Sequence, residues 1–308
     1  MWKQVRRVAL WILVILLAII AFGVVSNWSL VQRVFLGGVK VYETAPPSVP
    51  RDLNRPAILV FSKTNGFRHE EAIPAANALF AQMAKGEGWG YFQTENAATF
   101  TPTILAQFDV VVFNNVSGDV FLPQQRAALK SYVANGGGFV GVHGAGGDPS
   151  YDWRWYVETL IGAQFTDHPM NPQFQRATVR IEDKAHPATR SLPDTLERID
   201  EWYSFEKSAR KPGVTVLATL DESTYSPKSL FGGDLAMGQD HPIAWWHCTG
   251  KGRIFYSAMG HQAASYAEPH YRTMLLGAMG WALRLEGEGC SPNHVNAVVS
   301  TAVKAERR

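Results

Sequence analysis

Cysteine is scarce in this sequence: only Cys248 and Cys290 occur among its 308 residues. Their spacing excludes a zinc site of the Cys-x-x-Cys type. Two states stay open for them, one disulfide in an oxidising compartment or two unpaired structural thiols. A cysteine nucleophile is disfavoured, because Cys248 lies inside an apolar strand-like run and Cys290 follows the last predicted helix.

The chain also lacks a large excess of charge of either sign. Its formal charge is +2, and this small excess comes from Lys3, Arg6 and Arg7, so the rest of the chain is nearly neutral. Proteins that bind nucleic acids need many cations against the phosphates. We therefore expect no nucleic-acid partner.

A hydrophobic run from Val8 to Val25 marks the N-terminus. About 18 apolar residues can cross a bilayer as a helix, and the cations before the run predict that the chain starts in the cytoplasm. A cleaved secretory signal is the alternative, although its apolar core usually has only about 7–15 residues. Both interpretations place the body outside the cytoplasm, in the periplasm if the cell is Gram-negative, and an uncleaved single-pass anchor is favoured.

The hydrophobic pattern divides the chain into four parts. Residues 1–26 are predicted as the membrane anchor and 27–55, with three prolines and no clear period, as a tether. Residues 56–286 are predicted to form one α/β domain. Residues 287–308 are predicted to be a disordered tail.

The first half of this domain alternates strand and helix patterns. Apolar runs at 57–63, 109–115 and 138–142 predict strands buried on both faces of a sheet. Helical patterns at 70–85, with Gly86 as its stop, and at 123–135 separate them, which predicts a doubly wound, mostly parallel sheet.

The second half changes its pattern after residue 150. Its predicted elements are a helix over 152–165, antiparallel strands over 175–182 and 214–221, a hairpin over 243–258 and a closing helix over 271–285.

Three histidines follow predicted strands: His69, His143 and His261. Ligands bind at the carboxyl ends of the strands in such sheets, so we expect the three to meet in one cleft. Imidazole can act there as a general base near neutral pH or bind a metal such as zinc. The sequence has no His-Glu-x-x-His helix. No cofactor is therefore predicted, and a divalent metal is the less favoured alternative.

Other polar residues complete the predicted site. Asp200 and Glu201 are neighbours on an extended segment and should point to opposite faces, one into the cleft and one to solvent; Glu201 is assigned to the site. Arg68, beside His69, is a candidate clamp for an anionic or polyhydroxy ligand, with a plain surface charge as the alternative. The remaining candidate substrate contacts are Asn115, Tyr203 and His241.

Several motifs together resemble one known family. They are TNGFRH (64–69), GGGFVGVHGAGG (136–147), His186-Pro187, DEWYSF (200–205) and MGQDHPIAWWHCTGKGRIFYSAMGH (237–261). They are similar to the trehalose-utilisation (ThuA-like) family over about 56–285. The family resembles the class I glutamine amidotransferases in fold, which implies a flavodoxin-like sheet. Amidotransferases have a nucleophilic cysteine where this chain has His143, so the resemblance disfavours glutamine hydrolysis.

The resemblance also implies a function in carbohydrate catabolism. The expected ligand is a small sugar, trehalose-like or a 3-keto-glycoside, and a sugar oxidoreductase is a candidate partner in the same pathway. His143 would be the base and His261 a second acid/base or an orienting group, with His69 and Glu201 beside them. The alternative is a non-catalytic module that binds a sugar or a protein on an amidotransferase-like fold.

Overall fold

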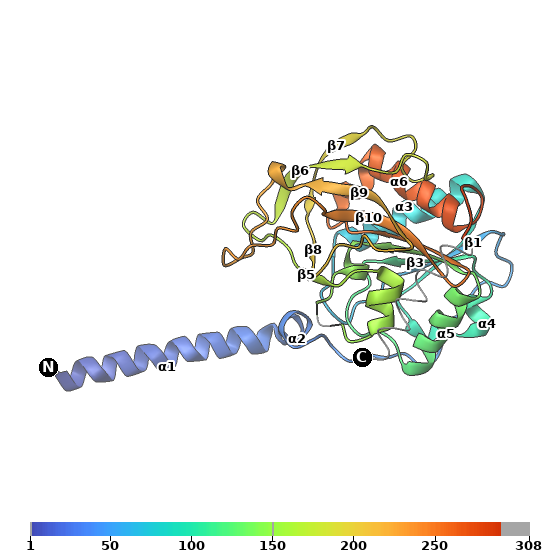
Figure 1. Cartoon of the computed structure of the whole chain (residues 1–308). Helices are drawn as coiled ribbons and strands as arrows, with labels where there is room; N and C mark the ends of the chain where they lie inside the picture. The colour runs from blue at the N-terminus through green and yellow to red at the C-terminus, as the bar shows by residue number, and fades with distance from the viewer. Residues whose placement is uncertain (1, 150, 291–308) are drawn as a thin grey trace.

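Figure 1 shows the fold as a computed structural model, which describes residues 2–149 and 151–290. The tail predicted over 287–308 lies outside the described residues from 291 onward. The strands are β1 (Ala57–Phe61), β2 (Gly90–Thr94), β3 (Val110–Asn114), β4 (Gly138–Val142), β5 (Phe165–Asp167), β6 (Phe174–Ile181), β7 (Thr195–Glu201), β8 (Ser204–Phe205), β9 (Val214–Asp221), β10 (Pro242–Thr249) and β11 (Gly252–Ser257).

One nine-stranded sheet runs through the domain in the order β2-β1-β3-β4-β11-β10-β9-β6-β7. The strands from β2 to β11 pair in parallel. Their order is the 2-1-3-4-5 order of flavodoxin-like folds, which confirms the predicted fold class. The strands from β10 to β7 extend this sheet with antiparallel pairings. β5 and β8 form a separate antiparallel pair.

Helices cover both faces of the sheet, as Figure 1 shows for α3 and α6 on one side and α4 and α5 on the other. Their bounds are α3 (Ala72–Glu87), α4 (Pro102–Leu105), α5 (Pro123–Ala134) and α6 (Pro269–Ala282), and the shorter turns are η1 (Ala97–Thr99), η2 (His143–Gly146), η3 (Trp155–Ile161), η4 (Glu222–Thr224) and η5 (Ala263–Ala267).

Burial on both faces explains the apolar strands of the parallel half. Every residue of β1, β3 and β4 is buried, as expected for parallel strands covered by helices on each side. Pro123 begins α5, where its missing N–H costs no hydrogen bond. α3 continues past the predicted stop at Gly86 and ends at Gly88, whose φ of 72° is the left-handed conformation that glycine adopts easily.

The helix predicted over 152–165 is present but shorter. Trp155–Ile161 is helical, as the π-helical turn η3, and ends at Gly162, whose φ of 98° is a left-handed conformation. Residues from Phe165 to Asp167 form β5, which pairs with β8 next to the site.

The N-terminal helix α1 (Trp2–Ser26) is exposed along its whole length. Its most apolar window has a mean hydropathy of 3.2, so it is long and apolar enough to cross a membrane. A signal sequence near the N-terminus can meet the same criteria of length and composition.

The predicted tether contains a helix that touches the domain. This helix, α2 (Trp28–Phe35), follows α1 closely, and the Arg33 guanidinium donates to the backbone oxygens of Thr64 at 2.7 Å and of Gly66 at 3.1 Å. Further along, Glu43 forms an ion pair with Lys63. The segment therefore packs against the loop that leads to His69.

The two cysteines form a disulfide, which decides between the two states left open by the sequence. Cys248 is buried in β10, and Cys290 follows α6 at the end of the described chain. The bond therefore fixes the residues after α6 to the central sheet. A structural disulfide is typical of proteins in oxidising compartments.

We predict that the native protein has no free thiol. Thiol labelling of the denatured protein should give no signal before reduction and two equivalents after it, because the chain has two cysteines. The bond closes a loop of 42 residues, so changing both cysteines to alanine should lower the free energy of unfolding by about 2–4 kcal/mol. Two thiols without reduction would contradict the pairing.

Candidate functional site

Loops from the parallel half meet at the carboxyl edge of the sheet. His69 follows β1, Asn115 follows β3, His143 follows β4 and His261 follows β11. Since these strands are adjacent and parallel, their loops lie on the same edge. The predicted convergence of the three histidines is therefore present in the structure.

His143 occupies a strained turn directly after β4. Its φ is 43°, a left-handed conformation that non-glycine residues rarely adopt and that costs about 1–3 kcal/mol. A Cβ on the next residue, Gly144, would lie 2.9 Å from Cε1 of His69. Glycine is needed there so that the two imidazoles can approach each other.

The carboxylate of the site comes from the antiparallel half. Glu201 ends β7, and its side chain is 1 % exposed. Its Oε2 lies 2.9 Å from Nδ1 of His261 and 3.4 Å from Nε2 of His143. The two histidine nitrogens are 3.1 Å apart.

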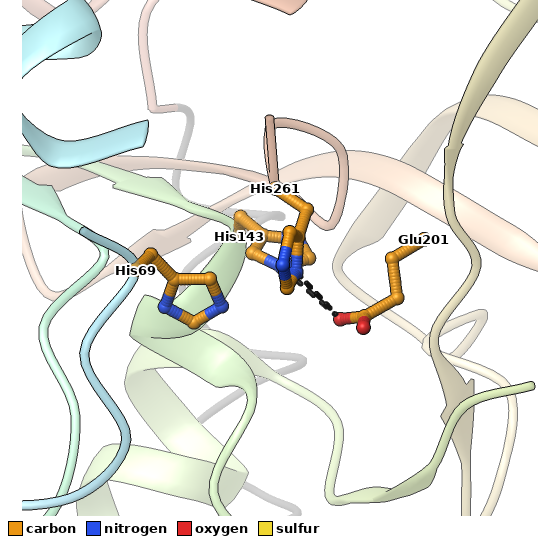
Figure 2. Close-up of side chains that lie close together, drawn as sticks. All are labelled: His69, His143, Glu201 and His261. Atoms are coloured by element: carbon orange, nitrogen blue, oxygen red, sulfur yellow. Dashed lines mark hydrogen bonds and ion pairs between the residues drawn. The ribbon is translucent and has the colours of Figure 1, made fainter. Parts of the chain in front are cut away.

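His69 completes a compact group, as Figure 2 shows. Its ring centroid lies 4.8 Å from that of His143 and 4.6 Å from that of His261. One nitrogen or oxygen from each of the four side chains lies within 4.8 Å of the others. We call His69, His143, Glu201 and His261 the histidine–glutamate centre.

A backbone carbonyl orients the most buried imidazole of the centre. The oxygen of Ala258 lies 2.7 Å from Nδ1 of His143, and a carbonyl can only accept, so Nδ1 carries the proton. Nε2 of His143 therefore presents a lone pair to the centre. The Tyr203 hydroxyl, 2.9 Å away, donates to it.

Burial controls the charges in the centre. It lowers the pKa of His143 and lowers that of His69 further, because an imidazolium is poorly solvated there. Burial alone would raise the pKa of Glu201, but its close contacts with His143 and His261, 3.4 and 2.9 Å away, hold it well below its ordinary value. The result is an ionised carboxylate next to neutral imidazoles. Such a set can exchange protons with a ligand or bind a divalent cation.

A pocket of about 430 Å³ opens onto the centre. His69, Glu201 and His261 lie in its wall, whereas His143 is fully buried beneath them. Aromatic side chains and helix α2 form other parts of the wall, including Arg33, Phe35, Phe67, Phe165 and Tyr203.

The other predicted ligand contacts have different surroundings. Tyr203 lines the pocket. His241 is buried behind it, with Nε2 2.7 Å from the Tyr203 backbone oxygen and Nδ1 2.7 Å from Glu222. Asn115 is also buried, and its side-chain oxygen accepts the N–H of Gly144. Both residues position parts of the site from outside the pocket wall.

Arg68 lies on the surface beside the site. Its guanidinium binds Glu95 at 2.9 Å and Glu70 at 3.0 Å, and it is absent from the wall of the pocket. The surface-charge alternative describes its position better than a ligand clamp does.

Asp200 corrects the expectation that one of the two adjacent carboxylates meets solvent. It is 0 % exposed and accepts the backbone N–H groups of Gly260 at 2.8 Å and His261 at 3.1 Å. Arg198 donates to it at 2.9 Å. The loop after β11 covers this face of β7, so both carboxylates are buried and Asp200 fixes the turn that carries His261.

Sequence reasoning missed two residues that contact Glu201. Nδ1 of His168 lies 3.2 Å from Oε1 of Glu201, and the Gln173 amide donates to the same oxygen at 2.5 Å. Both line the pocket. The Asp-His-Pro sequence at 167–169 was the available signal for His168, because the residue before proline is held extended. Gln173 carried no signal.

Comparison with known proteins agrees with the motifs. The family model described as trehalose utilisation, ThuA, matches residues 57–282. A ThuA-like protein from Bacteroides uniformis has a TM-score of 0.65 at 26% identity, over 77% of this chain and 95% of that chain. A ThuA-like protein from Parabacteroides merdae has a TM-score of 0.57 at 17% identity, over 78% of this chain and 94% of that chain, and shows the fold alone. None of the curated proteins compared matches the chain.

We predict that Asp200→Asn destabilises the protein by about 3 kcal/mol or more, because it leaves Arg198 buried without its main counter-ion. The control is Glu197→Gln, an exposed change on the same strand that should alter stability by less than about 0.5 kcal/mol. Denaturant unfolding of the three proteins measures both effects. Equal stabilities for the two variants would contradict the assigned role of Asp200.

Proposed function

Since the chain belongs to the trehalose-utilisation (ThuA) family, we propose that it is an enzyme of carbohydrate catabolism that acts on a trehalose-like glucoside or its 3-keto derivative. The family association supplies the class of substrate. The observation that carries the proposal is the histidine–glutamate centre in the wall of an open pocket. Burying an ionised carboxylate together with imidazoles costs free energy of desolvation. A module that only binds a ligand would not require such a cluster.

The pocket has the size and lining that a sugar requires. Its volume of about 430 Å³ lies in the range of about 300–1,000 Å³ found for small-molecule sites. Phe67 and Phe165 offer flat apolar surfaces for the C–H faces of a sugar ring, while Gln173 and Asp167 offer polar atoms for its hydroxyl groups.

His168 is the best-placed base for such a ligand. Its Nδ1 lies 3.1 Å from the Pro169 oxygen and 3.2 Å from Glu201, so both acceptors favour a proton on Nδ1. The other nitrogen, Nε2, is then unprotonated and able to accept a proton. His143, the base expected from the sequence, is fully buried and already accepts from Tyr203, so we assign it to the centre instead.

Proton abstraction beside a carbonyl is the reaction that this arrangement serves best. The base takes the hydrogen from a carbon next to the keto group, and the electron pair left on that carbon moves onto the carbonyl oxygen. An imidazole N–H of the histidine–glutamate centre would donate a hydrogen bond to that oxygen, which the Glu201 carboxylate cannot do. The electron pair can then return to expel the oxygen on the neighbouring carbon, which breaks the glycosidic bond, and the protonated His168 returns its proton to the departing oxygen. A 3-keto substrate must come from an earlier oxidation, which makes a sugar oxidoreductase the expected pathway partner.

We also propose that the domain lies outside the cytoplasm, held by α1. The cations Lys3, Arg6 and Arg7 precede the apolar part of α1, which favours a cytoplasmic N-terminus. The disulfide favours an oxidising compartment for the body. In a Gram-negative cell this compartment is the periplasm.

The catalytic proposal predicts a new product from a glucoside. The full chain, purified in detergent, is incubated with trehalose, other glucosides and their 3-keto forms, and the products are identified by mass spectrometry. His168→Asn removes the proposed base and should lower turnover by at least about 100-fold, the usual contribution of acid–base groups. His143→Ala disrupts the histidine–glutamate centre and should also lower turnover. The control is His270→Ala, an exposed histidine on α6 that should leave turnover unchanged.

Two outcomes would contradict this assignment. Saturable binding of a sugar without any product would instead support the binding module. Turnover that survives both histidine changes would remove the catalytic roles of these side chains.

The proposed location predicts that the full-length chain fractionates with the membrane and keeps its N-terminus. Intact-mass measurement should give the mass of the whole chain, and protease added to spheroplasts should digest the domain. A soluble product that begins after α1 would show a cleaved signal. A domain protected in spheroplasts would contradict the orientation.

A further inference from the structure

The histidine–glutamate centre has the composition of a metal site. Its four side chains offer three imidazole nitrogens and one carboxylate oxygen, all within 4.8 Å of one another. Imidazole and carboxylate together suit divalent ions of the zinc type, whereas calcium and magnesium prefer ligand sets made of oxygen. The residues come from separate strand ends, which explains why no ligand spacing is visible in the sequence.

The distances among three of these atoms agree with coordination of one ion, whereas the atom of His69 lies farther away, within 4.8 Å. Zinc bonds of about 2.0–2.1 Å in a tetrahedral site place neighbouring ligand atoms about 3.3 Å apart. In this structure, the separations among His143 Nε2, His261 Nδ1 and Glu201 Oε2 are 2.9, 3.1 and 3.4 Å.

The protonation of His143 also fits a ligand. Its Nδ1 donates to the Ala258 carbonyl at 2.7 Å, the kind of contact that usually orients a metal-binding histidine. Nε2 therefore faces Glu201 Oε2 with a lone pair, and both atoms are acceptors. A cation between them would turn this repulsion into attraction and replace the hydrogen bond that Tyr203 donates to Nε2.

The charge of Glu201 also favours a bound cation. Among residues 2–149 and 151–290, its ion-pair partners are His143, His168 and His261, and none is a lysine or arginine. A buried carboxylate needs compensating positive charge. A divalent ion would supply this charge while the imidazoles stay neutral.

His69 provides an independent observation. The residue is 6 % exposed, and its Nδ1 is buried without a hydrogen-bond partner in the described part of the chain. In Figure 2 its ring presents a nitrogen-bearing edge to the other three side chains. The nitrogen on that edge is Nε2, whereas the unpartnered Nδ1 lies on the other side of the ring, near the backbone of Gly144. Nε2 is therefore the atom of His69 that would coordinate an ion.

We infer that His69, His143, Glu201 and His261 bind one divalent transition-metal ion of the zinc type in the wall of the pocket. Such an ion would act as a Lewis acid toward a carbonyl or hydroxyl oxygen of a bound ligand. His168 lies outside this ligand set and keeps its role as the proposed base. The inference goes beyond the proposed function, because the ion would bind whether or not the ligand is a sugar.

The test measures metal directly. The full chain is purified in detergent, stripped with a chelator and titrated with Zn²⁺ or Co²⁺, with bound metal determined by elemental analysis and the Co²⁺ coordination by visible absorption. We expect about one equivalent per chain and the intense absorption of a four- or five-coordinate Co²⁺ ion. His69→Ala and Glu201→Gln should each weaken binding more than about 100-fold, because even residues behind the ligands usually contribute about 10–100-fold.

His270→Ala is the matched control and should bind like the unchanged protein, because this histidine is exposed on α6. Circular dichroism identifies any variant that fails to fold, and the titration of the unchanged chain is decisive without variants. Substoichiometric binding, or equal binding by His69→Ala, would overturn the inference. Metal binding without sugar turnover would remove only the proposed function. Turnover by metal-free protein would remove the Lewis-acid role given to the ion and leave the proposed function standing.

Discussion

The ionised carboxylate of Glu201 is the constraint around which the site is built. It is 1 % exposed, and every polar group that contacts it comes from a loop or a strand end. Keeping a charge in such a place requires hydrogen bonds to both oxygens, because an unpaired buried charge costs several kcal/mol. His261 and His143 approach one oxygen, and Gln173 and His168 approach the other. Three of these contacting residues, His168, Gln173 and His261, also form part of the pocket wall.

The site exists only because two kinds of sheet are joined. The parallel half brings His69, His143 and His261 to one edge. In a parallel sheet of this strand order, residues that directly follow the strands lie on the same edge. The antiparallel extension brings Glu201 to the same edge at the end of β7. Asp200, the residue before it, binds the backbone of the loop that holds His261. One pair of adjacent carboxylates thus connects the two halves, one through the backbone and one through the imidazoles.

The sequence predicted the parts of this arrangement that depend on local pattern. Continuous apolar runs identified β1, β3 and β4, and the rule that parallel strands end at one edge predicted the meeting of the histidines. The contacts of His168 and Gln173 were not predictable, because they depend on how β5 and its following loop fold over the centre. Burial of Asp200 was missed for the same reason, since alternation along a strand does not show which loops cover each face. The pairing of Cys248 with Cys290 also depends on tertiary approach, across 42 positions.

His143 shows how a catalytic turn can keep its geometry while its chemistry changes. A strained turn after a parallel strand normally lifts a nucleophile into an open site. Here the strain is retained, with a φ of 43°, but the side chain is fully buried and tied to the Ala258 carbonyl. A nucleophile must be exposed to its substrate. A coordinating imidazole instead needs a fixed tautomer, with the lone pair of one nitrogen directed at the ion. The turn that presents a cysteine in amidotransferases therefore presents, in this chain, a nitrogen to a centre shared with Glu201.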